Sequence, residues 1–164
     1  MKKYILLVFA VLCIIAFAST MSYEQQTIVP QLKTVLKNEP FKETLSKIEI
    51  IYWGKTISIE TKGYIYFIEF LIRKATHFIG YGIVGLIFFT FYRKMRLNFA
   101  PFLAVGTVFV IACLDEYIQY HTPGRTGIFV DVLLDTAGAI FFISITAIIL
   151  ALKSKRKGGR RTTR

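Results

Sequence analysis

Four long apolar runs constrain this chain more than any other feature. They cover Tyr4 to Ala18, Tyr64 to Tyr92, Phe99 to about Tyr120, and about Ile128 to Leu152. A helix of about 20 apolar residues crosses a hydrocarbon core of about 30 Å. Hydrophobic residues make up 54% of the 164, which leaves room for one modest polar segment. The sequence therefore predicts an all-α membrane protein with about four transmembrane helices.

The second run is too long to lie wholly in the hydrocarbon. As one helix, Tyr64 to Tyr92 would be about 42 Å long. The charged residues at 69, 73 and 74 offer a natural division. We expect Ala75 to Tyr92 to cross the membrane and Tyr64 to Ile72 to form an interfacial lead-in.

Basic residues beside the apolar runs predict the orientation. Lys2 and Lys3 precede the first run, Arg93 to Arg96 separate the second from the third, and residues 153–164 carry seven Lys and Arg. Such clusters favour the cytoplasmic side. We expect Lys94 and the C-terminus inside and Thr122 outside, with the first run acting either as an anchor or as a cleaved signal. We interpret the net charge of +11 as membrane electrostatics rather than nucleic-acid binding, and residues 153–164 as a disordered, lipid-attracted tail.

The predicted organisation is a first helix or signal (1–21), an extracellular segment (22–64), a three-helix membrane core (65–152) and a cytoplasmic tail (153–164). Within the extracellular segment, Glu24 to Lys37 has apolar residues at helical spacing, which is typical of a short amphipathic helix on the membrane surface; a solvated connector is equally compatible. The alternating stretch from Ile48 to Glu60 predicts a possible β-hairpin turning near Trp53 to Lys55. Cys13 and Cys113 lie in apolar runs, where a disulfide is not expected.

Polar residues lie at one level of the predicted core, at its outer side. They are Arg73, Lys74, His77 and Tyr81 at the start of the second run, Asp115, Glu116 and Gln119 at the end of the third, Arg125 in the following turn, and Asp131 and Asp135 at the start of the fourth. A charge in hydrocarbon is costly unless it is paired or hydrated. The three helices should therefore turn these side chains toward one another or toward a wet cavity. Snorkelling of Arg73 to lipid headgroups and simple packing of His77 are the alternatives for single residues.

The turn between the third and fourth runs contains Pro123 and Gly124, which favour a tight turn. It should place Arg125 at the rim beside the acids, where a guanidinium can form a fork onto a carboxylate or a phosphate. Whether the polar residues serve function or structure is open at this point.

The order and spacing of these residues resemble the VanZ-like family of small bacterial membrane proteins. The residues that carry the resemblance are Arg73-Lys-Ala-Thr-His with Tyr81, Asp115-Glu-Tyr-Ile-Gln, Pro123-Gly-Arg, and Asp131 to Asp135, with a weaker echo in Ser22 to Gln26. The resemblance implies a multi-pass plasma membrane protein with an uncleaved first helix. The family is named after a protein that confers low-level resistance to teicoplanin, a glycopeptide with a fatty acyl chain. Thr136 departs from the asparagine that is common in the family after the last acid.

The resemblance and the polar level together favour a protein that is not an enzyme and that engages an amphiphile, either a lipidated glycopeptide or a lipid-linked wall precursor. A membrane-embedded hydrolase or transferase is the main alternative, and a proton-coupled carrier is a third. We expect no metal or cofactor, because one histidine with scattered carboxylates is not a specific metal signature. The oligomeric state is open.

Overall fold

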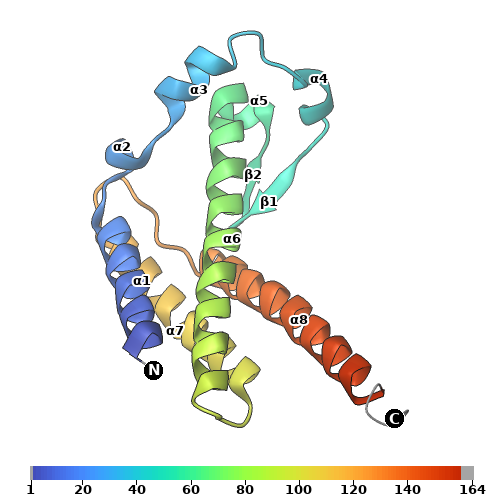
Figure 1. Ribbon diagram of the computed structural model, residues 1–164. Helices are drawn as coiled ribbons and strands as arrows, with labels where there is room; N and C mark the ends of the chain where they lie inside the picture. Colours follow the sequence, from blue (N-terminus) through green and yellow to red (C-terminus); the bar gives the residue numbers. More distant parts are fainter. Residues whose placement is uncertain (1, 160–164) are drawn as a thin grey trace.

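Four helices of the computed structural model are long and apolar enough to cross a membrane (Figure 1). The structure describes residues 2–159, with side chains described through residue 154. The four helices are α1 (Lys2–Thr20), α6 (Tyr64–Lys94), α7 (Ala100–Tyr120) and α8 (Phe129–Gly159). The predicted all-α class and the four spans are confirmed, and the chain is a multi-pass membrane protein.

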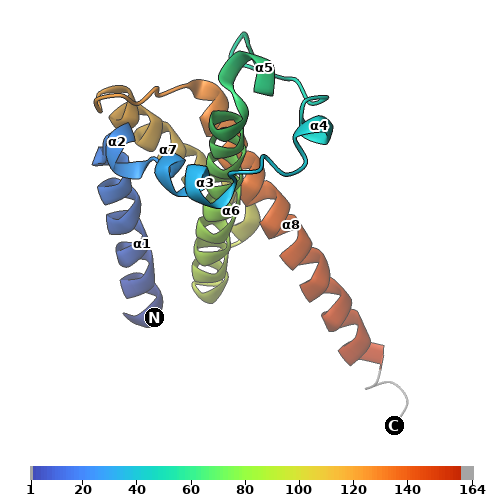
Figure 2. The same cartoon turned by 90° about the horizontal axis from the view of Figure 1, so that it is seen from above.

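Helix α6 packs against each of the other three long helices (Figure 2). Its closest partner is α8, because glycines remove the side chains that would hold the two backbones apart. A Cβ on Gly138 would collide with the main chain at Phe78, and one on Gly85 would lie 2.9 Å from Cβ of Ala139. These contacts fix the rotation of α8 about its axis, and with it the direction of the acids at the start of α8.

The core lies between α6, α7 and α8. Small residues on α7 allow this helix to pack closely against the other two. Ala104, Val108 and Ala112 are fully buried. Large apolar side chains such as Ile14 and Phe17 on α1 remain exposed on the outside of the bundle. An apolar exterior around a packed core is the surface that lipid solvates.

The first turns of α6 extend past the helix bundle, and short elements from the segment between α1 and α6 pack against them (Figure 1). Strands β1 (Ile50–Tyr52) and β2 (Lys55–Ile57) pair antiparallel, with Ile50 opposite Ile57. The turn has positive φ at Trp53 and Gly54, which suits the twist of a two-residue hairpin. The predicted hairpin is confirmed. Together with α5 (Ile59–Lys62) it packs on α6 through a second apolar cluster that includes the fully buried Phe67.

The stretch from Glu24 to Lys37 is helical, but not as one continuous helix. The segment forms two short helices, α2 (Tyr23–Gln26) and α3 (Val29–Val35), and α4 (Lys42–Leu45) follows. The chain leaves the helical path between α2 and α3, because the Ile28 N–H donates to the Glu69 side chain instead of to a helical carbonyl. Proline at position 30, in the first turn of α3, lacks an N–H and suits a helix start.

Helix α8 continues to Gly159, past Leu152, where the predicted fourth span ends. The disorder predicted for residues 153–164 stays a prediction. Extending an existing helix costs little, because each added residue gains a hydrogen bond, and Lys and Arg are good helix formers. Residues 160–164 lie outside the described residues. Cys13 and Cys113 are free, in agreement with the sequence.

Candidate functional site

The turn between α7 and α8 is built as its sequence predicts. The Arg125 N–H donates to the Thr122 carbonyl at 3.1 Å, and Gly124 takes a φ of +72°. This is the geometry of a type II turn with proline at its second position. The turn directs the Arg125 side chain back over the polar level.

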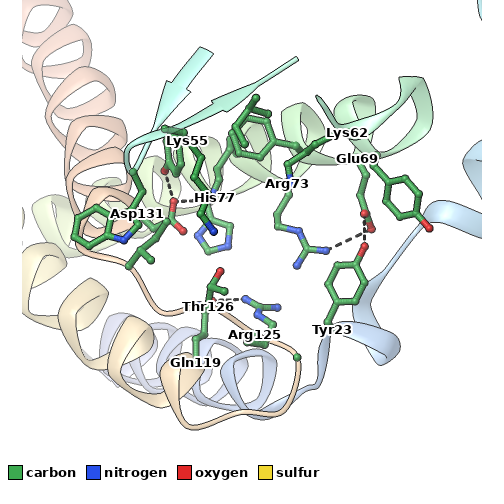
Figure 3. A pocket seen from close by; sticks show the side chains of 18 residues that line it. Tyr23, Lys55, Lys62, Glu69, Arg73, His77, Gln119, Arg125, Thr126 and Asp131 are labelled. Atoms are coloured by element: carbon green, nitrogen blue, oxygen red, sulfur yellow. Dashed lines mark hydrogen bonds and ion pairs between the residues drawn. The ribbon is translucent and has the colours of Figure 1, made fainter. Parts of the chain in front are cut away.

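Arg125 does not form a fork onto a carboxylate. Its guanidinium donates to the side-chain carbonyl oxygens of Gln26 and Gln119. Burial lowers the pKa of Arg125, and the positive charge of Arg73 lowers it further. Figure 3 shows the two guanidinium groups facing one another across a pocket. The charge of Arg125 is therefore held in place by amides and is left available for an anion.

Lys74 joins α6 to the start of α8. Its Nζ lies 2.5 Å from Asp131 Oδ1, with the two side chains 17% and 7% exposed. The Tyr52 hydroxyl donates to the same oxygen, and burial together with this bond raises the pKa of Tyr52. The ammonium group also lies 4.7 Å from the centre of the Tyr52 ring. The hairpin thus adds a third element to an ion pair between α6 and α8.

Glu69 ties the segment after α1 to α6, a role that the sequence did not reveal. Its carboxylate accepts from the hydroxyls of Tyr23 and Thr27, both at 2.6 Å, and from the Ile28 N–H at 3.2 Å. Arg73 lies 3.4 Å from it, one helical turn away. The only signal in the sequence was an acid within an apolar run, with the weak family echo around Tyr23.

A deeper group lies below these residues, between α6, α7 and α8. His77 Nδ1 is 3.2 Å from Asp135 Oδ1. The Tyr81 hydroxyl donates to Asp115 at 2.7 Å, and the Ser19 hydroxyl donates to the other oxygen of Asp115. Ser19, on α1, was not among the predicted residues. It brings the first helix into the polar level.

Glu116 is 5% exposed, and only one of its two oxygens has a partner within the described residues. Oε2 accepts from the Ile128 N–H at 2.9 Å, just before α8 begins. Oε1 is buried without a hydrogen-bond partner. A buried carboxylate oxygen without a partner is costly, so this atom requires an explanation.

A pocket of about 430 Å³ opens above this group (Figure 3). It is lined by α6, the hairpin and the α7–α8 turn. Six predicted residues contribute to its wall, namely Arg73, Lys74, His77, Gln119, Arg125 and Asp131. The remaining four, Tyr81, Asp115, Glu116 and Asp135, lie beneath it. The predicted set therefore divides into a pocket wall and a buried layer.

The hairpin, α5 and the start of α6 add residues that were not among the predicted site residues. Tyr52, Trp53, Lys55, Lys62 and Tyr66 also line the pocket. Trp53 and Lys55 entered the sequence analysis only as part of the predicted turn. Thr136, the departure from the family pattern, bonds to the main-chain oxygen of Val132 and takes no part in the polar contacts described above.

Positive charge dominates the pocket wall. Five cationic side chains line it, against two carboxylates. The cations are Lys55, Lys62, Arg73, Lys74 and Arg125, and the carboxylates are Glu69 and Asp131. Such a wall attracts anions, and planar guanidinium groups suit phosphate or carboxylate oxygens in particular.

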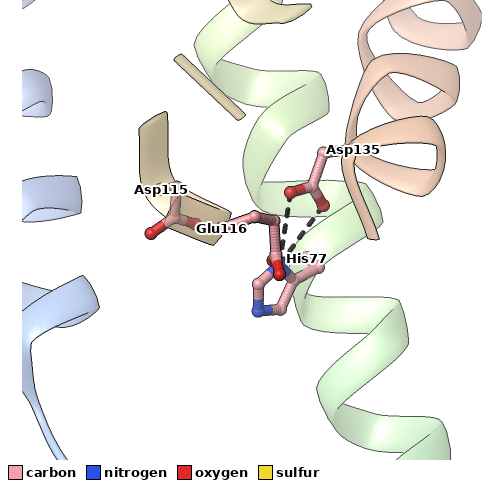
Figure 4. Close-up of side chains that lie close together, drawn as sticks. All are labelled: His77, Asp115, Glu116 and Asp135. Carbon is pink, nitrogen blue, oxygen red and sulfur yellow. Dashed lines mark hydrogen bonds and ion pairs between the residues drawn. The ribbon is translucent and has the colours of Figure 1, made fainter. Parts of the chain in front are cut away.

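His77 on the pocket wall and three acids of the buried layer are potential metal ligands. One ligand atom from each of His77, Asp115, Glu116 and Asp135 lies within 4.8 Å of the others (Figure 4). The sequence predicted no metal, because these residues are scattered along three helices. Their convergence is a product of the helix packing.

Comparison with known proteins agrees with the resemblance seen in the sequence. The VanZ/LLP1 family model matches residues 4–150, which cover most of each of the four spans and every residue of the pocket wall. No curated protein and no solved structure matches the chain. The match extends well beyond the motifs in the membrane core, and the chain is a member of the VanZ/LLP1 family.

Proposed function

We propose that the pocket binds the anionic polar group of an amphiphile at the outer face of the bacterial plasma membrane. The amphiphile is a lipid-linked wall precursor or a lipidated glycopeptide, and its capture contributes to low-level resistance of the teicoplanin type. This proposal joins the family membership to the chemistry of the pocket wall.

The observation that carries the proposal is the pair of guanidinium groups facing one another. Arg125 is held by two neutral amides, so its charge is not cancelled by a carboxylate. Arg73 is 3.4 Å from Glu69, longer than a close ion pair. Two arginines at such proximity repel each other, and an anion between them removes the repulsion.

The hairpin turn and the first turns of α6 supply the less polar part of the pocket. Trp53 and Tyr66 are 56% and 47% exposed, and Phe70 lies beside them on the wall. Aromatic side chains with one polar and one apolar end are typical of membrane interfaces. Such side chains can contact the part of an amphiphile where its polar group joins its apolar chain.

A hydrolase or transferase acting on the same amphiphile is the second candidate. The observation that favours it is the His77–Asp135 pair, since His77 lines the pocket and a carboxylate beside Nδ1 orients an imidazole for proton transfer. This alternative predicts a chemically changed amphiphile, whereas simple capture leaves it intact.

A matched ligand pair tests the proposal. Purified protein in nanodiscs is mixed with a polyprenyl monophosphate or with the corresponding neutral polyprenol. We expect the phosphate to bind at least about 10-fold more tightly, because one charge-assisted interaction is worth about 1.5–3 kcal/mol. Mass spectrometry of the recovered lipid distinguishes capture from hydrolysis or transfer.

Variants locate the binding. Arg125→Gln and Arg73→Gln should each weaken binding of the phosphate by about 10-fold while leaving the polyprenol unaffected. Arg96→Gln, at the other end of α6 in an exposed turn, is the matched control. Equal binding of both ligands, or wild-type binding in both pocket variants, contradicts the proposal.

A further inference from the structure

We propose that His77, Asp115, Glu116 and Asp135 bind one divalent transition-metal ion beneath the pocket. The sequence gives no reason to expect this, because the residues come from three helices. The inference concerns the buried layer and does not depend on which amphiphile the pocket accepts.

The spacing of the four side chains fits a single ion. Their ligand atoms lie within 4.8 Å of one another. Bonds of about 2.0–2.2 Å place neighbouring ligand atoms about 3 Å apart and opposite ones about 4.3 Å apart. His77 Nδ1 and Asp135 Oδ1, at 3.2 Å, already have the separation of two neighbouring ligands. A small inward movement of the other side chains completes the shell.

Glu116 provides an independent observation. Its Oε1 is buried without a partner, while the Ile128 N–H fixes Oε2 on the other side of the carboxylate. Figure 4 shows the carboxylate reaching from α7 toward His77 and Asp135. A cation is the partner that such an oxygen lacks.

Neighbouring donors orient the proposed ligands. The hydroxyls of Ser19 and Tyr81 both donate to Asp115, from α1 and α6. Hydroxyl donors around a carboxylate fix its direction. Asp115 therefore has supporting donors behind it, as metal ligands in proteins commonly do.

The mixture of one imidazole with three carboxylates suits Zn²⁺, Mn²⁺ or Fe²⁺ better than an all-oxygen site for Ca²⁺ or Mg²⁺. His77 also lines the pocket, which gives an ion a route from solvent. Bound there, the ion would lie at the floor of the pocket and add positive charge to it.

The test measures metal in the full-length protein, purified with a histidine-free tag and without chelators. We expect about one equivalent of Zn²⁺, Mn²⁺ or Fe²⁺ per chain by elemental mass spectrometry. After chelation, adding back the ion at 100-fold over its Kd should raise Tm by roughly 5–10 °C. No retained ion together with no shift in Tm for any of the three ions overturns the proposal.

Variants identify the ligands. Glu116→Gln and His77→Ala should weaken binding by about 100-fold or more, while His121→Ala and Glu60→Gln should bind normally. The control residues are exposed. Wild-type affinity in either ligand variant refutes the assignment of that residue.

X-ray absorption of the wild-type protein decides the case if the ligand variants do not fold. The proposal requires a nitrogen and oxygen shell with scattering from one imidazole, retained in His121→Ala, and sulfur scattering would overturn it. Loss of phosphate binding with the ion retained would remove the proposed function and leave the metal site standing.

Discussion

The Lys74 ammonium lies 2.5 Å from Asp131 Oδ1, and the Tyr52 hydroxyl donates to that same oxygen. Two helices and the hairpin therefore share one carboxylate. Asp115, on the third helix of the core, is instead bonded by Ser19 and Tyr81.

The partner choice predicts the outcome of a double-mutant cycle. Lys74→Met leaves Asp131 without its cation and should destabilise the protein by about 3–5 kcal/mol. Adding Asp131→Leu should recover part of that loss, whereas adding Asp115→Leu should not. Thermal unfolding of the purified variants in one detergent provides the measurement. Additive losses in the Lys74–Asp131 double variant would show that Lys74 only extends toward lipid headgroups.

The basic clusters predict that the α7–α8 turn is outside and Lys94 inside. Thr122 is buried, so the exposed neighbour His121 is the better position for a label. In a Cys13→Ser, Cys113→Ser background, His121→Cys should react with an impermeant thiol reagent on intact cells. Lys94→Cys should react only after permeabilisation. The reverse pattern would invert the orientation.

Tyr52 should make the protein sensitive to alkali. Its pKa is raised in the folded state by burial and by its bond to Asp131. The folded state therefore holds this proton more tightly than the unfolded state. The resulting stability is fully present below the unfolded pKa of about 10 and declines as pH rises above it. Tyr52→Phe should flatten the decline in Tm above pH 10, whereas Tyr66→Phe, at an exposed position, serves as the control. A decline equally steep in Tyr52→Phe would exclude this contribution.

Production of the protein in a susceptible bacterium should raise tolerance to teicoplanin-type drugs more than to vancomycin, because only the former carry an acyl chain. Arg125→Lys should weaken the effect, since an ammonium cannot contact Gln26 and Gln119 as a planar guanidinium does. Asp131→Asn should weaken it with little change in volume. Dose–response curves against both drugs measure the effect, with membrane abundance of each variant as the control. Equal tolerance to both drugs would count against the lipidated glycopeptide as ligand.

Local patterns in the sequence were sufficient for the four spans and the hairpin. Four apolar runs gave the spans, and alternation around Gly54 gave the hairpin. Apolar runs and apolar periodicity are properties of a few neighbouring residues. They can therefore be recognised without knowing which other elements the segment packs against. The break between α2 and α3 escaped this reasoning because its cause, Glu69, lies some 40 residues away in the sequence.

The sequence by itself also determined that polar residues from three helices share one level, because helix length and topology fix depth in a bilayer. The tertiary structure alone decided which of them meet. The bonds from Ser19 to Asp115 and from Tyr52 to Asp131 join residues 96 and 79 positions apart. Pairing depends on the rotation of each helix about its axis, and close contacts such as Gly138 against Phe78 set that rotation. The composition of the chain and the spacing of its polar residues do not specify this rotation.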